Sequence, residues 1–188
     1  SSSVTEKPKG ANWRDKVENG GGAMFEMASH LIDLNNYLFG KPIDVSGSIL
    51  KQMYSNNVED IVKTNILHEN GLSGSLYVNW SDTSYRKPMI SVEAIGTKGK
   101  IISDFYGYKI FLNEENESLK MRKGWNVFRL PDVNGSVDFY VRGNEFSKQL
   151  FYFADSIINN VTSNDSSFKD ALATQIIIEK ININSKNR

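Results

Sequence analysis

The middle of the chain is a run of short, strand-like segments separated by tight turns, and this pattern constrains the fold more than any other feature. Asn70-Gly71 and Gly96-Thr97-Lys98-Gly99 are typical hairpin turns between stretches rich in branched and aromatic residues. Because a tight turn can join only antiparallel neighbours, the sequence predicts a mostly antiparallel sheet. The predicted strands are 43–54, 59–68, 72–81, 89–95, 100–105, 108–112, 118–122 and 125–130.

Helical periodicity flanks this run on both sides. From Ala23 to Phe39 apolar residues recur at helical spacing, and Gly40 with Pro42 marks the end. A second helix is predicted at about 142–160, and a third begins near a capping-box pair, Ser167 and Asp170. One helix, many strands and two further helices predict an α+β domain, an open antiparallel sheet with helices packed on one face.

The first 22 residues differ from the rest of the chain. Residues 1–22 are polar and end in a run of three glycines, so they are interpreted as a connector. Residues 23–188 then form the α+β domain. A chain of 188 residues with 39% hydrophobic content is long enough for one well-buried core and short for two.

Composition excludes several classes of function. Lysine plus arginine and aspartate plus glutamate number 22 each, so no net field is present to hold nucleic acid. Cysteine is absent, which excludes disulfides, thiolate nucleophiles and sulfur-ligated metals and agrees with a cytoplasmic location. No signal peptide or stretch of roughly 18 apolar residues is found, so no membrane association is expected.

Polar residues gather on one face of the first predicted helix. Glu26, His30, Asp33 and Tyr37 are spaced four, three and four residues apart and share that face. In one interpretation the stripe is simply solvated. In another it lines a cleft, where His30 exchanges protons and Glu26 hydrogen-bonds the imidazole and fixes its tautomer.

A metal site is a third interpretation of this stripe, because nitrogen and oxygen donors on one helical face can bind zinc or iron. The other histidine, His68, lies near a predicted hairpin turn and is expected to be exposed, so it does not favour a metal. No metal is expected.

Other polar residues are candidates for contacts with a substrate. Arg86 and its neighbour Lys87 stand before a predicted strand, where they could meet an anionic substrate such as a sugar nucleotide or remain solvated. Tyr140 and Arg142, at the entry to the penultimate helix, could reach the same cleft as His30. Trp80 is expected to pack in the core rather than to stack on a sugar.

The sequence resembles a known family over nearly its whole length. Trp13-Arg14, the stretch from Gly20 to Leu34 and Tyr37-Leu38-Phe39-Gly40-Lys41-Pro42 look like the opening of the C-terminal domain of the glucose-fructose oxidoreductase, inositol dehydrogenase and MocA family. The two turns, the strand that ends in Asn79-Trp80-Ser81 and the final helix follow in that family's order.

The resemblance implies the C-terminal half of a two-domain oxidoreductase acting on a CH–OH group of a sugar, polyol or sugar nucleotide. NAD or NADP is bound by the N-terminal Rossmann domain in that family, and a histidine at the position of His30 serves in acid–base chemistry. An assisting residue one turn earlier, commonly aspartate, corresponds to Glu26. Asp33 is expected either to contact a substrate hydroxyl or to brace the helix.

Two elements of that family are not found in this sequence. No Gly-x-Gly-x-x-Gly follows a predicted strand, so the Rossmann domain is absent and the isolated chain is expected to be inactive. Glu6-Lys7-Pro8 matches the family's catalytic lysine motif but lies too close to His30 and in a polar tail, so it is rejected.

A non-catalytic function remains as the alternative. A domain of this fold could serve as a sugar-binding or dimerisation module. Helices on one side leave the other sheet face to be covered, so a homo-oligomer through the sheet is expected in either case.

Overall fold

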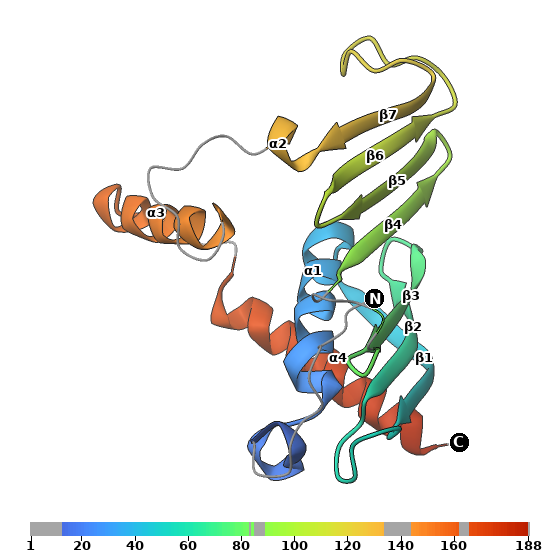
Figure 1. Cartoon of the computed structure of the whole chain (residues 1–188), viewed down its shortest axis with the longest axis vertical. Helices are drawn as coiled ribbons and strands as arrows, with labels where there is room; N and C mark the ends of the chain where they lie inside the picture. Colours follow the sequence, from blue (N-terminus) through green and yellow to red (C-terminus); the bar gives the residue numbers. More distant parts are fainter. Residues whose placement is uncertain (1–12, 83, 85–88, 134–143, 162–165, 188) are drawn as a thin grey trace. The chain divides into compact units, whose positions relative to one another are not determined.

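The computed structural model describes residues 13–82, 84, 89–133, 144–161 and 166–187. The chain forms two compact units, one from Ser1–Met89 with Ser166–Arg188 and the other from Ile90–Asp165. The chain therefore leaves the first unit and returns to it after the second. The helices and strands of both units are labelled in Figure 1.

The first unit contains a three-stranded antiparallel sheet in the order β1-β2-β3. Its strands are β1 (Pro42–Lys51), β2 (Ile61–His68) and β3 (Ser73–Asn79). The predicted turn joins β2 to β3, where Gly71 has a φ of 81° and the Leu72 N–H donates to Asn70 Oδ1 at 3.0 Å.

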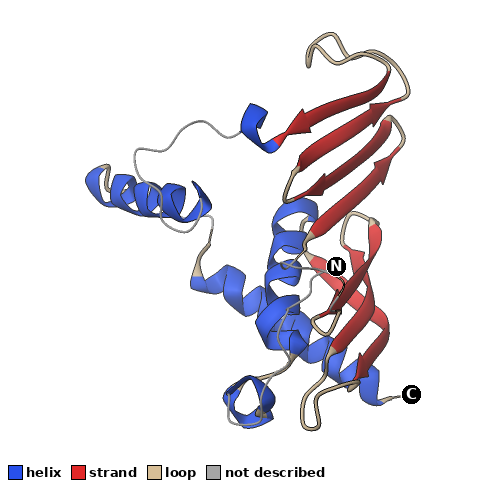
Figure 2. Cartoon of the chain, in the orientation of Figure 1, coloured by secondary structure: helices blue, strands red, loops and turns tan. Residues whose placement is uncertain are grey.

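Helices cover one face of this sheet (Figure 2). They are the π-helical turn η3 (Met24–Ala28), α1 (Ser29–Phe39) and α4 (Phe168–Lys186); α4 packs on β1 and α1 packs on α4. Burial of their apolar stripes against the strands forms the core, as the α+β prediction requires. The core residues are Ala23, Met24, Ala28, Ile32, Val45, Val58, Val62, Ile66, Leu76, Val78, Trp80, Ile177, Ile178 and Ile181.

Alternation along β2 separates a buried face from a polar open face. Val62, Thr64, Ile66 and His68 are buried. The expectation of an exposed His68 is therefore wrong, because the histidine is in phase with the apolar residues of its strand. On the open face lie Lys63, Asn65, Ser75, Tyr77 and Asn79, which are mostly polar.

The second unit contains a four-stranded antiparallel sheet in the order β4-β5-β6-β7. Its strands are β4 (Ser91–Gly96), β5 (Gly99–Asp104), β6 (Gly107–Leu112) and β7 (Gly124–Arg129). The strand predicted at 118–122 is wrong, because this segment makes only an isolated bridge between Asn116 and Met121 within the β6–β7 connection.

Both faces of the four-stranded sheet carry apolar residues. The register places one set on the same face: Val92, Ala94, Ile101, Tyr108, Ile110, Leu112 and Phe128. The other face carries Ile95, Ile102, Phe111, Trp125 and Val127. It also carries an ion pair between Lys100 and Glu93, with an N–O distance of 2.8 Å. No residue of these four strands is buried.

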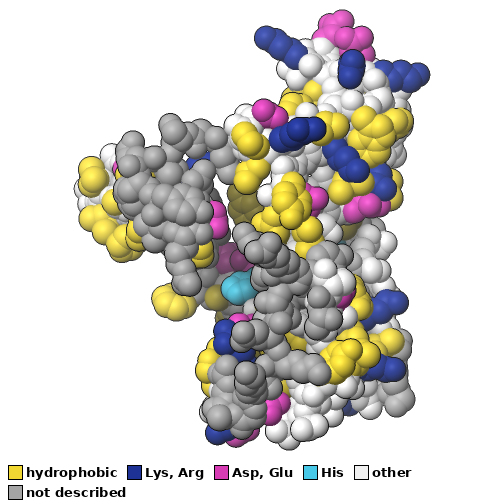
Figure 3. Space-filling model, in the orientation of Figure 1, with side chains coloured by type: hydrophobic (Ala, Val, Ile, Leu, Met, Phe, Trp, Pro, Cys, Tyr) yellow, Lys and Arg dark blue, Asp and Glu magenta, His cyan; other side chains and the backbone are white. Residues whose placement is uncertain are grey.

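Two more helices belong to the second unit, α2 (Leu130–Val133) and α3 (Asn144–Ile158). α3 confirms the predicted penultimate helix, and its apolar residues Phe146, Leu150, Phe153 and Ile157, which recur at helical spacing, are exposed. Hydrophobic side chains are visible on its surface in Figure 3.

The last helix begins as predicted. The Asp170 N–H donates to Ser167 Oγ at 3.3 Å, and the Ser167 N–H donates to Asp170 Oδ2 at 2.8 Å, which confirms the capping box.

Within the described residues, no helix combines the length and the apolar character that a membrane span needs.

Candidate functional site

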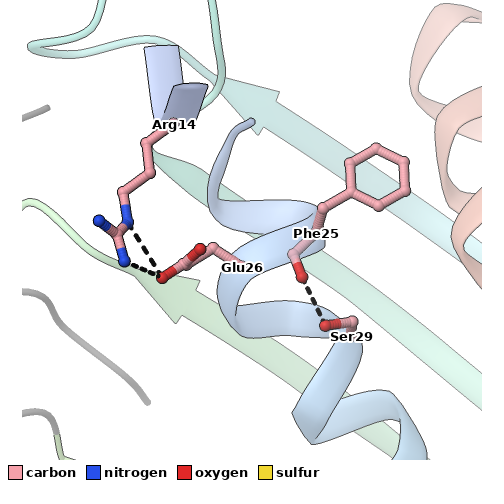
Figure 4. A network of polar contacts seen from close by, with 4 residues as sticks. All are labelled: Arg14, Phe25, Glu26 and Ser29. Carbon is pink, nitrogen blue, oxygen red and sulfur yellow. Dashed lines mark hydrogen bonds and ion pairs between the residues drawn. The ribbon is translucent and has the colours of Figure 1, made fainter. Parts of the chain in front are cut away.

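The helix that carries the predicted polar stripe begins with a wide turn. η3 is π-helical, and the Ser29 N–H that closes it bonds to the Met24 carbonyl. The Ser29 hydroxyl donates to the bypassed carbonyl of Phe25 at 2.6 Å (Figure 4). Such π-helical turns occur often at functional sites.

The glycine run before this turn allows the chain to lie against the helix start. An added Cβ at Gly21 would stand 2.4 Å from the carbonyl oxygen of Arg14. The Gly22 N–H donates to the same oxygen at 3.0 Å, and Gly22 has a φ of 104°. Only glycine permits this approach. The described part of the expected connector includes two 3₁₀ turns, Trp13–Asp15 and Val17–Asn19. Its backbone is hydrogen-bonded to the glycine run that leads into the stripe's helix.

Glu59 binds the first N–H groups of the helix. Its Oε1 accepts from the Met24 N–H at 2.8 Å, and its carbonyl accepts from the Ala23 N–H at 2.9 Å. Burial raises the pKa of the Glu59 carboxyl, and the hydrogen bond from Met24 opposes this rise. A carboxylate therefore already occupies the helix N-terminus.

Glu26 is paired with Arg14. Arg14 Nη2 and Nε both donate to Glu26 Oε1, at 2.9 Å and 3.1 Å (Figure 4). Glu26 Oε2 makes no hydrogen bond among the described residues. The arginine, rather than His30, is thus the observed partner of this carboxylate.

His30 lies one helical turn after Glu26 and is exposed. It makes no hydrogen bond with any described residue, so both ring nitrogens are available to a ligand. An accessible imidazole on a rigid helix can donate or accept a proton at a bound hydroxyl.

Asp33 is bound to the last helix. Thr174 Oγ1 donates to Asp33 Oδ1 at 3.2 Å, and Asn36 Nδ2 lies 3.5 Å from the same hydroxyl. Thr174 is 7% exposed, so this contact joins α1 to α4 at a sheltered point. Of the two expected roles, the observed contact is that of a brace. Tyr37 is 69% exposed at the end of the stripe.

Three of the candidate residues lie outside the described residues: Arg86, Tyr140 and Arg142. Their expected contacts with substrate stay predictions. Of the three stripe residues in the metal interpretation, Glu26 is bound by Arg14 through Oε1 and Asp33 by Thr174 through Oδ1. The described residues contain no cluster of three histidine, aspartate or glutamate side chains that could hold a metal.

Two buried hydrogen-bonded groups, centred on His68 and on Asp60, lie in the first unit. His68 Nδ1 lies 2.9 Å from the Gly40 carbonyl, and its Nε2 lies 3.2 Å from Asn35 Nδ2. Trp80, 2% exposed, donates from Nε1 to Asp60 Oδ1 at 2.6 Å. Trp80 therefore packs in the core, as expected.

The first part of the chain matches a known family. The model of the GFO/IDH/MocA C-terminal domain matches residues 2–102. The chain belongs to the GFO/IDH/MocA family. This confirms the resemblance that the glycine run and the helix after it indicate. No curated protein sequence matches the chain.

Solved structures share the fold of the family's C-terminal domain. The apo form of levoglucosan dehydrogenase is 20% identical with a TM-score of 0.79, and 98% of this chain aligns with 54% of that protein. Its complex with NADH and levoglucosan is 19% identical with a TM-score of 0.75, covering 94% and 52%. The aldose-aldose oxidoreductase from Caulobacter crescentus is 16% identical with a TM-score of 0.67, covering 98% and 51%. The chain spans about half the length of these proteins.

The described residues do not fit a dinucleotide. In the Rossmann fold the pyrophosphate sits at a helix N-terminus after a glycine-rich strand–helix turn. Here the glycine run leads into a helix whose first N–H groups bind Glu59, and both sheets are antiparallel. A carboxylate at this position repels phosphate.

Sequence reasoning missed three residues of this site, Arg14, Glu59 and Thr174. All three act through contacts between segments far apart in the sequence. Two signals were available: Trp13-Arg14 is part of the family resemblance, and three consecutive glycines before a helix indicate that another part of the backbone comes close.

Proposed function

We propose that the chain is the substrate-binding half of an NAD(P)-dependent oxidoreductase that acts on a CH–OH group of a sugar, polyol or sugar nucleotide. The observation that carries the proposal is His30, exposed and without a hydrogen-bond partner among the described residues, on the helix that the family match covers. His30 takes the proton of the substrate hydroxyl.

The substrate class is supported by the solved structures. Levoglucosan dehydrogenase has been solved with NADH and levoglucosan and with NADH and L-sorbose, and the Caulobacter crescentus protein acts on aldoses by its name. All three names refer to sugars. We therefore propose a polyhydroxylated substrate over His30, with Arg86, Tyr140 and Arg142 as further candidate contacts.

The dinucleotide is assigned to a separate N-terminal Rossmann domain. Two observations support this: the Glu59 carboxylate binds the helix start that follows the glycine run, and the aligned structures are about twice as long as this chain. The 188 residues alone are then expected to be inactive and to bind neither NAD nor NADP.

Association through the sheet is part of the proposal. The open face of the three-stranded sheet is mostly polar, whereas one face of β4–β7 exposes the apolar side chains of Ile95, Trp125 and Val127. We propose that this apolar face contributes to a homo-oligomer. A module that only binds sugar or dimerises is the alternative, favoured by the same face.

Replacing each of the two histidines by alanine in the full-length protein tests the catalytic proposal. NADH or NADPH formation is followed by absorbance with levoglucosan, aldoses and inositols as substrates. His30→Ala is expected to lower kcat by about two to four orders of magnitude with an unchanged melting temperature, because a positioned proton-transfer group is lost.

His68→Ala is the matched control, because His68 is buried and bonded to the Gly40 carbonyl. It is expected to lower the melting temperature and to reduce activity only in proportion to unfolding. Near-normal turnover of His30→Ala at full stability refutes the acid–base role. A wild-type protein that oxidises no sugar or polyol with either dinucleotide favours the non-catalytic module.

A further inference from the structure

We propose that Arg14 is a positioning residue for Glu26, which it holds and neutralises beside His30. This inference rests on the proposed function. Nothing in the family resemblance gives Arg14 a role, and the assignment follows from the contacts of its side chain and backbone.

The ion pair anchors one carboxylate oxygen and leaves the other unoccupied. Both Arg14 donors converge on Glu26 Oε1, at 2.9 Å and 3.1 Å, and Oε2 has no hydrogen bond among the described residues. Figure 4 shows the guanidinium and the carboxylate pointing toward each other, with the Phe25 ring directed away. Oε2 thus remains for the imidazole one turn on or for a substrate hydroxyl.

Arg14 is itself held in place. Its guanidinium carbon lies 5.0 Å from the centroid of the Trp13 ring, a cation–π contact. Its carbonyl accepts from the Gly22 N–H, and the missing side chain of Gly21 admits that carbonyl to the helix start. The Arg14 and Glu26 side chains are 39% and 20% exposed, so the pair is partly sheltered from solvent.

Anchoring matters because glutamate has one more rotatable bond than aspartate. A free glutamate side chain samples several rotamers, whereas a carboxylate bound through two donors keeps one arrangement. Arg14 also cancels the charge of Glu26. Without the arginine, a lone carboxylate one turn from His30 would favour the imidazolium form, which cannot accept the hydroxyl proton.

Four variants of the full-length protein test this role: Arg14→Gln, Arg14→Lys, Glu26→Gln and the double variant Arg14→Gln/Glu26→Gln. Arg14→Gln is expected to lower kcat about 10- to 100-fold with little change in KM, because a displaced catalytic group costs about that much. The acidic limb of its kcat/KM profile is expected to move to higher pH, since the uncompensated carboxylate favours imidazolium.

Two variants separate positioning from a merely structural role. Arg14→Lys restores a cation and is expected to recover part of kcat and to return the acidic limb toward its wild-type position. The double variant is expected to be no slower than the slower single variant, because residues that act through one another are not additive. Its acidic limb is expected at or below the wild-type position, since the carboxylate is gone.

Lys41→Gln is the matched control. It breaks an exposed ion pair of the same 2.9 Å length, between Lys41, which follows the end of α1, and Glu69. This variant is expected to keep wild-type kcat and pH profile. Wild-type kcat and an unmoved acidic limb in Arg14→Gln, at full stability, overturn the inference, as do additive losses in the double variant.

A readout without turnover keeps the inference separate from the proposed function. The ring proton resonances of His30 are followed by NMR in the same variants over a range of pH. Displaced His30 resonances in Arg14→Gln, recovered in Arg14→Lys, support the positioning role even where the wild-type protein oxidises no sugar. His30 resonances that are identical in wild type and Arg14→Gln overturn it.

Discussion

Replacing Asp60 by asparagine is expected to destabilise the first unit more than any other single polar change on its sheet. Asp60 is fully buried between the 53–55 loop and Trp80. Its Oδ2 accepts from the N–H groups of Met53, Tyr54 and Ser55 at 2.6, 2.8 and 3.0 Å. Its Oδ1 accepts from Ser55 Oγ at 2.7 Å and Trp80 Nε1 at 2.6 Å.

An amide cannot replace all five acceptor contacts. With its oxygen toward the loop, the NH₂ of the substituted asparagine would face Ser55 Oγ, which can rotate and accept, and Trp80 Nε1–H, which cannot. One buried donor left unpaired costs about 1–3 kcal/mol, and the three loop bonds lose their charge assistance. The expected loss in the free energy of unfolding is about 3–4 kcal/mol, a large part of the stability of a typical domain.

The pH dependence of this variant gives an independent check. Burial by itself raises the pKa of Asp60, but the hydrogen bonds from Ser55, Trp80 and Tyr54 outweigh it and hold the pKa well below its ordinary 3.8. The carboxylate therefore stabilises the fold above the unfolded-state pKa, and this stabilisation is lost as the pH falls through the lower folded-state value. Asp60→Asn lacks this pH-dependent stabilisation, so its loss of unfolding free energy relative to the wild type is largest near neutral pH and becomes smaller in acid.

Urea unfolding followed by circular dichroism and tryptophan fluorescence measures the loss. Asp82→Asn is the control, because hydrogen bonds from Ser84 also lower the pKa of Asp82, and among the described residues its carboxylate bonds only to Ser84. It is expected to leave the urea midpoint unchanged. If Asp60→Asn unfolds within about 0.5 kcal/mol of the wild type, a typical effect of a surface change, the buried acceptor is not what holds the loop.

Two further variants test the helix start. Glu59→Gln keeps an acceptor for the Met24 N–H and removes a carboxyl whose pKa is raised by burial. The variant is therefore expected to have a higher melting temperature than the wild type at pH 7, and this difference is expected to vanish below the ordinary pKa of 4.5. An equal difference in melting temperature at every pH contradicts this explanation. Gly21→Ala places a Cβ 2.4 Å from a backbone oxygen and is expected to lower the free energy of unfolding in urea by about 2 kcal/mol or more. Gly20→Ala meets no atom within 4 Å and is strained only by its left-handed backbone, so its expected loss is about 1 kcal/mol. Equal losses in the two variants refute the steric explanation.

Local signals predicted most elements of the fold. Alternation and turn residues located the strands to within a few residues, and the Ser167 and Asp170 pair located the last helix. The π-helical turn at Met24–Ala28 was not predictable, because it depends on which carbonyl each N–H selects. The segment 118–122 was wrongly predicted as a strand because it alternates polar and apolar residues. Among the described residues it pairs with no strand and makes one isolated bridge.

The candidate site was predictable only where it follows helical periodicity. The stripe of Glu26, His30 and Asp33 could be identified from spacing alone. Their partners could not, because Arg14 lies twelve residues from Glu26 and Thr174 lies 141 residues from Asp33. Burial of His68 could have been read from its phase with Val62 and Ile66, but its position near a turn outweighed that signal.

The return of the chain from the second unit to the first sets an order for synthesis. Ile177, Ile178 and Ile181, which close the core over β1–β3, come from α4, which is synthesised after the whole of the second unit. Until then the nascent chain presents the apolar face of β1–β3 without one of the helices that cover it. Domains generally fold as units while they are made. Here the first unit is begun before the second and completed only after it, so its sheet stays open to chaperones while the second unit is made.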